Sequence, residues 1–396
     1  MTKNLTLMKV CFIVFISLVG LLSLSGCGNN ESSSVSKGDK DTIKIGASLP
    51  LSGTIGYMGK EVDQGIKAVI EMTNDNGGIN GQLIEYAGVD DSYDPSVHLS
   101  NTRFLVEQEN VVALVGSLGT ESLLAAAKYL NPKNIPVIGA LSIADSVNNP
   151  AQNSLFALPS PQSTGGPALV EYAVKDLGAK RIAMVYQNDS WGKPAYEFAK
   201  KKLNSLGQEF VAVVNFEPDA GNMSTQFHQI QKADPDAVIL YAMGSQAAQF
   251  VNEVGNSGLD WDILGADGIN SPDWVELVGE NGEGVISLSN YHTLDSPEME
   301  WVKGLHEKYG YPTPTPNSLM GTSAALVFVE AAKMIKGEIT SEALLEAMEN
   351  IKNFDQNNIG PEISFGKLEE GPDSRRGQTD LVIVQVQNGR FETITK

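Results

Sequence analysis

The stretch Val111-Val-Ala-Leu-Val-Gly-Ser-Leu-Gly-Thr120, followed by Glu121-Ser-Leu-Leu-Ala-Ala-Ala-Lys-Tyr-Leu130, joins a predicted strand to a predicted helix. Its Val- and Leu-rich run predicts a buried strand, the segment from Gly116 to Gly119 a turn, and the Leu/Ala-rich run a helix with Thr120 as N-cap. The first amides of a helix lack intrahelical acceptors and lie at the positive end of its dipole. This junction can bind a carboxylate, but the same residues also serve simply as a turn and a cap.

The same alternation of strand and helix extends in both directions. Strands are predicted at 43–49, 83–89, 111–115, 135–139, 181–186, 210–216, 237–242 and 262–265, with helices between them. Two successive series of similar length predict an α/β protein with two doubly wound parallel sheets. The tail adds a strand at 285–289, three helices, and extended segments at 362–366, 380–387 and 390–394. Because the long tail helices need a sheet to cover, we expect the tail to return to the first domain.

Residues 1–26 have the features of an export signal. Lys3 and Lys9 provide a basic start, residues 10–24 an apolar run, and Leu24-Ser-Gly-Cys27 places small residues before a cysteine. The apolar run is shorter than the roughly 20 residues that span a membrane. The segment resembles the lipobox of bacterial lipoproteins, which implies cleavage before Cys27 and a lipid anchor on Cys27 outside the cell membrane. An uncleaved anchor is the alternative. Residues 27–41 then form the lipidated cysteine and a flexible tether.

Charge and composition exclude several function classes. The net charge is −20, and removal of the leader with its two lysines leaves 26 basic against 48 acidic residues, a net charge of −22. Nucleic acid is therefore not an expected partner. Both cysteines, Cys11 and Cys27, belong to the leader or the anchor, so thiol chemistry is not expected. The sequence contains no phosphate-loop or hydrolase motif. Its four histidines lack metal-ligand spacing and are predicted to be surface or capping residues: His98, His228, His292 and His306. We expect no metal, no cofactor and no enzymatic reaction.

Polar and aromatic residues follow the predicted strands, at the edge where open α/β sheets bind ligands. In the first lobe these segments are 49–58, 117–120 and 140–143, and in the second they are 186–191, 242–246 and 265–270. The first set supplies hydroxyls and helix-start amides, whereas the second supplies aromatic rings and a carboxylate. Such a combination suits a small zwitterion.

Five segments of the chain, taken together, resemble those of a known family. They are Leu51-Ser-Gly, Asn76-Gly-Gly-Ile-Asn-Gly81, Asp90-Asp-Ser-Tyr-Asp-Pro95, Val115-Gly-Ser-Leu-Gly-Thr120 and Tyr186-Gln-Asn-Asp-Ser-Trp-Gly192. In order and spacing, over about residues 42–396, the chain resembles the branched-chain-amino-acid-type periplasmic binding proteins of ABC importers. The resemblance implies the type I periplasmic-binding-protein fold, with a three-crossover hinge that closes around the ligand. It implies one lobe from residues 42–158 plus 287–377 and another from 159–286 plus 378–396.

The resemblance also implies roles for individual residues. A ligand carboxylate would meet the amide and hydroxyl of Thr120 with Ser52 or Ser142, and the ammonium would meet a carbonyl of Leu118 or Leu141 and the carboxylate of Asp267. The expected ligand-binding set is Ser52, Tyr57, Met58, Leu118, Gly119, Thr120, Leu141, Ser142, Tyr186, Gln187, Trp191, Met243 and Asp267. By residue type alone, Asp267 also suits a turn and Trp191 a half-buried surface position. Ile143 and Met58 depart from the family, in which a threonine and an aromatic residue are common.

These observations predict an extracellular, lipid-anchored solute-binding protein. It would capture an amino acid, amide or related acid as a monomer and deliver it to the transmembrane subunits of an ABC permease. A ligand-sensing receptor of the same fold is the alternative, and an extracellular lipoprotein enzyme is a further one. Recovery of unchanged ligand after saturable binding would separate a binding protein from an enzyme.

Overall fold

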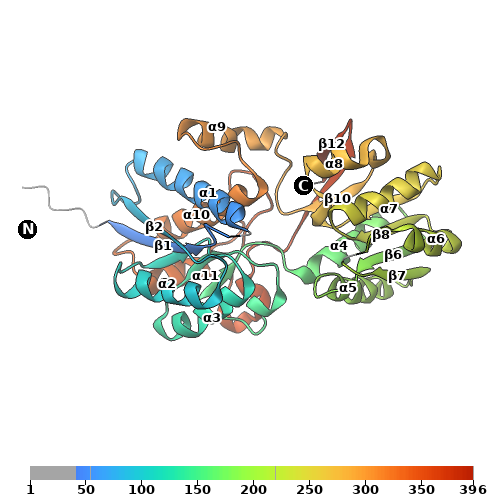
Figure 1. The fold of residues 1–396 in the computed structure, drawn as a ribbon. Helices are drawn as coiled ribbons and strands as arrows, with labels where there is room; N and C mark the ends of the chain where they lie inside the picture. Colours follow the sequence, from blue (N-terminus) through green and yellow to red (C-terminus); the bar gives the residue numbers. More distant parts are fainter. Residues whose placement is uncertain (1–41, 54, 219, 396) are drawn as a thin grey trace, which may run out of the picture. The chain divides into compact units, whose positions relative to one another are not determined.

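The computed structural model describes residues 42–53, 55–218 and 220–395. The predicted signal peptide, Cys27 and the tether lie outside these residues. Two β-sheets, each flanked by helices, form two lobes (Figure 1). The predicted α/β fold with two sheets is therefore confirmed. In the described part of the chain, no helix has both the length and the apolar character needed to span a bilayer.

The first sheet consists of five parallel strands in the order β2-β1-β3-β4-β5. These strands are β1 (Ile43–Leu49), β2 (Ile84–Asp90), β3 (Ala113–Val115), β4 (Val137–Ala140) and β5 (Leu155–Ala157). Its helices are α1 (Gly56–Asp75), α2 (Pro95–Glu107), α3 (Thr120–Leu130), α9 (Glu300–Lys308), α10 (Pro316–Met334) and α11 (Ser341–Glu349). One core joins Ile45 of β1, Val62 of α1 and Phe328 of α10, so the tail returns to the first sheet as expected.

Helices α1 and α10 pack with their backbones in close contact. A Cβ on Gly65 of α1 would lie 2.0 Å from Ser318 O, and one on Gly321 of α10 would lie 2.0 Å from Val62 O. Only glycine fits at these two positions, because any side chain would collide with the facing backbone. This crossing fixes the start of α10, which lines a cavity described below.

The second sheet has seven strands in the order β12-β11-β10-β9-β8-β6-β7. They are β6 (Ile182–Gln187), β7 (Ala212–Phe216), β8 (Ala237–Tyr241), β9 (Asp262–Gly265), β10 (Ile286–Ser289), β11 (Val382–Gln387) and β12 (Arg390–Thr395). The helices are α4 (Gln162–Lys175), α5 (Gly192–Ser205), α6 (Ser224–Ala233), α7 (Gly244–Asn256) and α8 (Pro272–Val278). This sheet is not wholly parallel, because β11 runs antiparallel to β10 and β12. The turn at Asn388-Gly389, with both φ angles positive, folds the last two strands into a hairpin.

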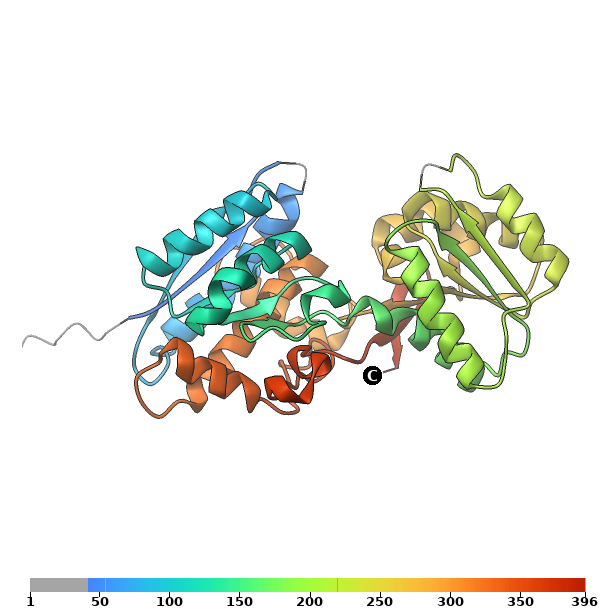
Figure 2. The same ribbon diagram turned by 90° about the horizontal axis from the view of Figure 1, so that it is seen from below.

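The chain crosses between the sheets three times, and hydrogen bonds join the three crossovers. Ser160 of the first crossover donates through its amide to Asn290 Oδ1 at 3.0 Å and through its hydroxyl to Asp380 O at 2.9 Å. Gln378 Nε2 of the third crossover donates to Asn290 O at 3.3 Å. The second crossover begins after Ser289, the end of β10, and thus later than the expected boundary at residue 286. Figure 2 shows these connecting segments between the two sheets.

Two further expectations differ from the structure. Three of the four histidines are buried: His98, His292 and His306. The prediction that they are surface or capping residues is therefore wrong. His98 Nδ1 lies 2.7 Å from Asp91 Oδ2, because the inner face of α2 carries His98 toward a buried carboxylate. The extended segment at 362–366 forms an isolated bridge, Phe354 with Ile363, rather than a regular strand.

Candidate functional site

Strands β3 and β4 are neighbours in the first sheet, so their carboxyl ends bring two predicted ligand-binding segments together. Leu118 and Leu141, which follow these strands, form a parallel bridge, and Gly119 N donates to Leu141 O at 3.3 Å. One residue further along each segment, Thr120 Oγ1 lies 2.8 Å from Ser142 Oγ. The sheet therefore places at one point two hydroxyls that were predicted to meet a ligand carboxylate.

Helix α3 begins at Thr120, and its N-cap is Gly119, with a φ of 106°. The prediction that Thr120 caps this helix is therefore wrong. Gly119 turns the chain through a left-handed backbone conformation, so Thr120 enters the helix as its first residue and its hydroxyl points to Ser142. The amides of the first turn have no acceptor within the helix, so hydroxyl and amides together can bind an anion.

The hydroxyl pair has a favourable direction for binding an anion. Ala144 N donates to Ser142 Oγ at 3.1 Å. An amide nitrogen can only donate, so the Ser142 hydroxyl accepts at this contact and keeps its own proton for another acceptor. When Ser142 donates to Thr120, the proton of Thr120 is in turn available to a ligand. Whichever of the two hydroxyls donates to the other, the pair therefore keeps one proton for an anion.

Ser52, predicted as a further hydroxyl for the carboxylate, is engaged with Asp90. Its Oγ donates to Asp90 Oδ2 at 2.5 Å and lies 2.8 Å from Ser92 Oγ, while Asp90 also accepts from the amides of Leu51, Ser52 and Ser92. Burial tends to raise the pKa of Asp90, but these hydrogen bonds, led by that from the Ser52 hydroxyl, bring it below its usual value. The resulting negative charge would repel a ligand carboxylate. We therefore place Ser52 outside the anion site.

Exposed aromatic rings lie on the first lobe near the start of two helices. Tyr57, in the first turn of α1, is 60% exposed, and Met58 beside it is half-buried. Tyr93 is 51% exposed and lies against Gly119, because a Cβ on Gly119 would be 3.0 Å from Tyr93 Cε2. The sequence interpretation did not include Tyr93 among the expected ligand-binding residues. Asp94, next to it, caps α2 by accepting from the amides of Ser96 and Val97. A large aromatic residue in a turn otherwise made of Asp and Ser was the available signal.

In the second lobe, Asp189 fixes the position of Trp191. Asp189 Oδ1 accepts from the amides of Trp191 and Gly192 at 2.9 and 2.8 Å, and Gln187 Nε2 donates to Asp189 Oδ2 at 2.5 Å. Burial tends to raise the pKa of Asp189, but these bonds, led by the Gly192 amide, lower it. Trp191 lies against Tyr241, with 4.4 Å between ring centroids. Trp191 is thus half of an aromatic pair, and Gln187 supports it through Asp189.

Tyr186 and Met243 lie at different depths. Tyr186 is 9% exposed and stacks on Tyr196 at 5.0 Å between ring centroids, so it belongs to the core and offers a ligand little surface. Met243 is 40% exposed and is the N-cap residue of α7. A Cβ on Gly268 would lie 2.8 Å from Met243 Cγ, so Met243 borders the turn that contains Asp267.

Asp267 begins a short 3-10 turn, Asp267–Ile269, directly after β9. Its side chain is exposed at the edge of a cavity, and the protein atoms crowded around it disfavour its charged form and raise the pKa of Asp267. Amides of the turn, led by that of Gly268, act in the opposite direction. Burial also raises the pKa of Tyr241, and the charge of Asp267 adds to that effect. A carboxylate in this setting is stabilised by a nearby cation.

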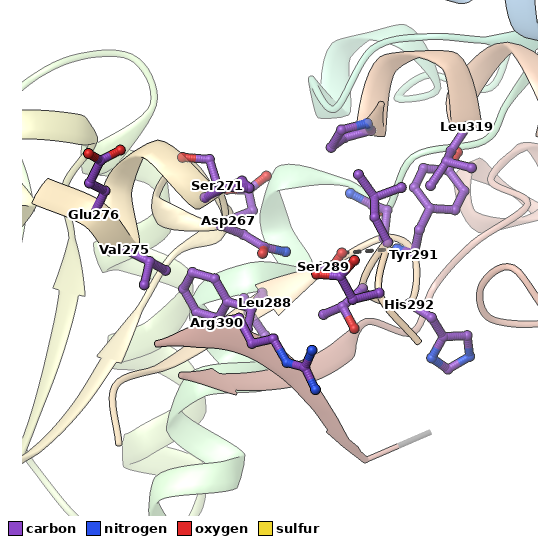
Figure 3. Close-up of a pocket in the computed structure, with 18 of the residues that line it drawn as sticks. Asp267, Ser271, Val275, Glu276, Leu288, Ser289, Tyr291, His292, Leu319 and Arg390 are labelled. Atoms are coloured by element: carbon purple, nitrogen blue, oxygen red, sulfur yellow. Dashed lines mark hydrogen bonds between the residues drawn. The ribbon is translucent and has the colours of Figure 1, made fainter. Parts of the chain in front are cut away.

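A cavity of about 520 Å³ opens beside Asp267. In Figure 3, Val275 and Asp267 of the second lobe lie on one side of it, and Tyr291 and Leu319 lie on the other. Its apolar lining comprises Val275, Leu288, Tyr291, Leu294, Leu319, Met320 and Phe391. The sequence interpretation included none of these seven residues, because tail elements reach the cavity only through the fold.

A second, much smaller pocket of about 20 Å³ connects the surroundings of Asp267 to the first lobe. Ile143, the residue after Ser142, lines this pocket together with Gln162, Tyr241 and Asp267. The position at which the family resemblance leads us to expect a threonine is therefore occupied by an apolar side chain close to the predicted ammonium site.

The predicted residues thus form two groups on two sheets. Gly119, Thr120 and Ser142 contact one another on the first, whereas Trp191 and Asp267 lie at the carboxyl ends of strands in the second. Among the described residues, no three His, Cys, Asp or Glu side chains are grouped so that they could hold a metal ion.

Comparisons with known proteins agree with this architecture. The periplasmic binding protein family matches residues 42–390. A relative, Leu/Ile/Val-binding protein homolog 7 of Brucella melitensis, is 23% identical over 343 residues, which cover 80% of this chain and 86% of the relative. The crystal structure of a putative branched-chain amino acid ABC transporter from Rhodospirillum rubrum has a TM-score of 0.79 at 20% identity, over 89% of this chain and 100% of that one. The crystal structure of a branched-chain amino acid ABC transporter from Thermus thermophilus with bound valine has a TM-score of 0.71 at 20% identity. The match covers 90% of this chain and 96% of that one.

The family match includes every helix and strand of both lobes except β12, of which it covers only the first residue. It also implies an extracytoplasmic location and a role in solute binding. The two solved structures support the two-lobed fold independently of close sequence identity. This chain therefore belongs to the periplasmic binding protein family.

Proposed function

We propose that this protein is the lipid-anchored substrate-binding protein of an ABC importer, and that it captures an amino acid or amino-acid-like molecule between its lobes for delivery to a permease. The observation that carries the proposal is a pair of converging hydroxyls on one sheet and a carboxylate beside a cavity on the other. Thr120 and Ser142 meet at the start of α3, and Asp267 follows β9. A zwitterion complements both ends at once.

The carboxylate end would bind at the start of α3. The Thr120 hydroxyl and the first-turn amides donate to it, and Ser142 orients the Thr120 hydroxyl. Gly119 has no side chain to obstruct the approach, and Tyr93 borders the same place. Hydrogen bonds to a charged acceptor are shorter and stronger than neutral ones, so this end fixes the head group.

The ammonium end would bind Asp267 together with a backbone carbonyl of the first lobe. Leu141 O already accepts from Gly119 N, but a carbonyl oxygen has two lone pairs and can accept again. Leu118 O is the second candidate. Because desolvation raises the pKa of Asp267, a bound cation relieves a cost that the free protein bears.

The ligand side chain would extend along apolar and aromatic surface. Trp191 with Tyr241 forms one wall, and the cavity of about 520 Å³ beside Asp267 is within the size range of small-molecule sites. Ile143 contributes an apolar contact in place of a hydroxyl, so head-group recognition depends on Thr120 and Ser142. This composition favours ligands with an apolar side chain.

Capture would involve closure of the two lobes at the hydrogen-bonded crossovers. A ligand that contacts both lobes binds the closed state more tightly than the open one, and it shifts the population by that difference in affinity. The permease would recognise the closed, monomeric form. Upstream of the described residues, Cys27 would carry the lipid and residues 28–41 would form the tether. A Cys27→Ser variant should fail to incorporate labelled fatty acid.

Calorimetry of the purified protein against the twenty common amino acids and their amides tests the proposal. We expect saturable binding of one ligand per protein, with the ligand recovered unchanged. Absence of binding across the panel, or conversion of the ligand, would contradict it. Deletion of the gene should lower uptake of the ligand by cells, whereas a purely sensory role would leave uptake intact.

A further inference from the structure

Arg376 is a buried cation between the hinge and the anion site. Arg376 is 2% exposed and lies at the start of the third crossover. Nη1 donates to Ser142 O at 2.6 Å and to Pro159 O at 3.1 Å, and Nη2 donates to Ala144 O at 2.8 Å. One guanidinium therefore binds both the loop that carries Ser142 and the first crossover.

The three acceptors are backbone carbonyls, so the charge of Arg376 is solvated by peptide dipoles rather than by a contacting carboxylate. Burial lowers the pKa of Arg376 to about 10, while the negative charges of Asp145 and Asp373 act in the opposite direction. The guanidinium therefore remains protonated at neutral pH. Its positive charge lies directly behind a loop whose other side presents the Ser142 hydroxyl.

The loop after β4 is held at three consecutive carbonyls. Those of Ser142 and Ala144 accept from Arg376, and that of Ile143 accepts from Gln162 N at 2.7 Å. Gln162 is the first residue of α4, just beyond the first crossover. The Ser142 hydroxyl is thereby set against Thr120 by residues of the hinge itself.

We propose that Arg376 is the positioning residue of the anion site: it fixes the Ser142 hydroxyl against Thr120, and its buried positive charge favours a ligand that carries a carboxylate. This inference rests on the proposed function. The inference goes beyond the proposed function, because it assigns the preference for a ligand carboxylate to a residue that the ligand does not touch.

The neighbouring Arg375 provides a matched control. It is equally buried, but its Nη1 donates to Gly366 O at 2.7 Å and its Nη2 to Glu349 Oε1 at 2.6 Å. Its guanidinium also lies 4.5 Å from the ring centroid of Phe156. A carboxylate neutralises this arginine away from Ser142, so Arg375 supports the fold without contacting the loop.

The test compares Arg376→Lys with Arg375→Lys in the purified protein. Calorimetry first identifies which of the twenty common L-amino acids binds most tightly to the wild type, and the second probe is the carboxamide of that amino acid. Lysine keeps the charge but cannot reproduce the planar fork that bonds three carbonyls. Arg376→Lys should weaken binding of the amino acid by at least about tenfold and that of its carboxamide by much less, since only the former has a charged acceptor. Arg375→Lys should lower the melting temperature without changing the ratio of the two affinities.

An unchanged ratio in Arg376→Lys, or the same change in Arg375→Lys, would overturn the inference while leaving the proposed function intact. Failure of the wild type to bind any of the twenty amino acids would instead overturn both. Should Arg376→Lys not fold, the Nε–H signal of Arg376 can be followed in the wild type by NMR, after assignment by elimination among the five arginines. The amino acid should shift that signal more than its carboxamide does, and equal shifts would contradict the role of Arg376.

Discussion

Thr120 Oγ1 lies 2.8 Å from Ser142 Oγ, although the two residues belong to different strand-to-helix connections. Neighbouring parallel strands produce this contact, because β3 and β4 end at the same edge of the sheet. The amide of Ala144 fills an acceptor position of Ser142 and one hydroxyl proton joins the pair, so the other hydroxyl proton remains available to an incoming anion. The first-lobe site is therefore arranged to donate hydrogen bonds.

Thr120→Val removes one of these donors and keeps the side-chain shape. A hydrogen bond to a charged group contributes about 1.5–3 kcal/mol, so we expect affinity for an amino acid to fall by roughly 10- to 100-fold. Calorimetry measures this loss. Thr73→Val is the matched control, because its hydroxyl donates to Val69 O within α1. Unchanged affinity in Thr120→Val would remove Thr120 from the site.

Asp267→Asn should greatly weaken amino-acid binding and raise the stability of the ligand-free protein. The pKa of Asp267 is higher in the folded protein than the usual value of 3.8, so protonation favours folding. The stability that this proton contributes is present below pH 3.8 and is lost as the pH rises through the raised pKa. At neutral pH the charged carboxylate is therefore a cost, which asparagine removes. Thermal unfolding with and without ligand measures both effects.

Asp262→Asn is the control for that experiment. Burial, together with the charges of Asp260 and Asp236, raises the pKa of Asp262 too, but Asp262 begins β9 whereas Asp267 follows its end. This variant should also gain stability at neutral pH, yet bind the ligand normally. A loss of binding in both variants would show that the effect is not specific to Asp267.

Trp191 should report ligand binding by its fluorescence. Its ring packs at a tilt against Tyr241 at the wall of the proposed site, so a bound ligand would alter its surroundings. We expect a change in emission on ligand addition that disappears in Trp191→Phe, with affinity reduced about tenfold or less because the phenyl ring retains part of the contact. Trp301→Phe, in the first lobe, should retain the change. An undiminished signal in Trp191→Phe would place the ligand elsewhere.

His98→Ala should destabilise the fold, because it leaves the buried carboxylate of Asp91 without its partner at 2.7 Å. Removing one hydrogen-bond partner of a buried charged group costs about 1.5–3 kcal/mol. Urea unfolding measures this loss, and His228→Ala, at an exposed position, should have little effect. A loss below about 1 kcal/mol would mean that Asp91 is stabilised mainly by Ser48 and the backbone.

Local sequence patterns predicted the strands, turns and helix starts that depend on neighbouring residues in the chain. The apolar run before Gly116 gave the strand, and the turn at Gly119 led correctly to a helix start, which is why Thr120 could be selected. The N-cap was misplaced by one residue, because the glycine conformation that decides it is not visible in residue types. The family resemblance, rather than periodicity, singled out Asp267.

Contacts between distant segments were not predictable from the same patterns. Arg376 bonds to the carbonyl of Ser142 across 234 positions, and no local signal links an arginine in the tail to that loop. Likewise, the burial of His98 depends on the position of Asp91 after folding. Ser52 was predicted as a donor to the ligand, but its hydroxyl meets Asp90 on the neighbouring strand. Sequence identifies the chemical groups, whereas the fold decides which of them remain available.

The central claim is that one ligand joins the Thr120 end of the first lobe to Asp267 of the second. The most direct measurement is calorimetry of an amino acid, its carboxamide and its des-amino acid with the wild type, Thr120→Val and Asp267→Asn. We predict that Thr120→Val reduces only the difference in affinity between the amino acid and its carboxamide. Asp267→Asn should reduce only the difference in affinity between the amino acid and its des-amino acid. Equal affinity of the wild type for all three compounds, or the same pattern in both variants, would contradict a two-ended clamp.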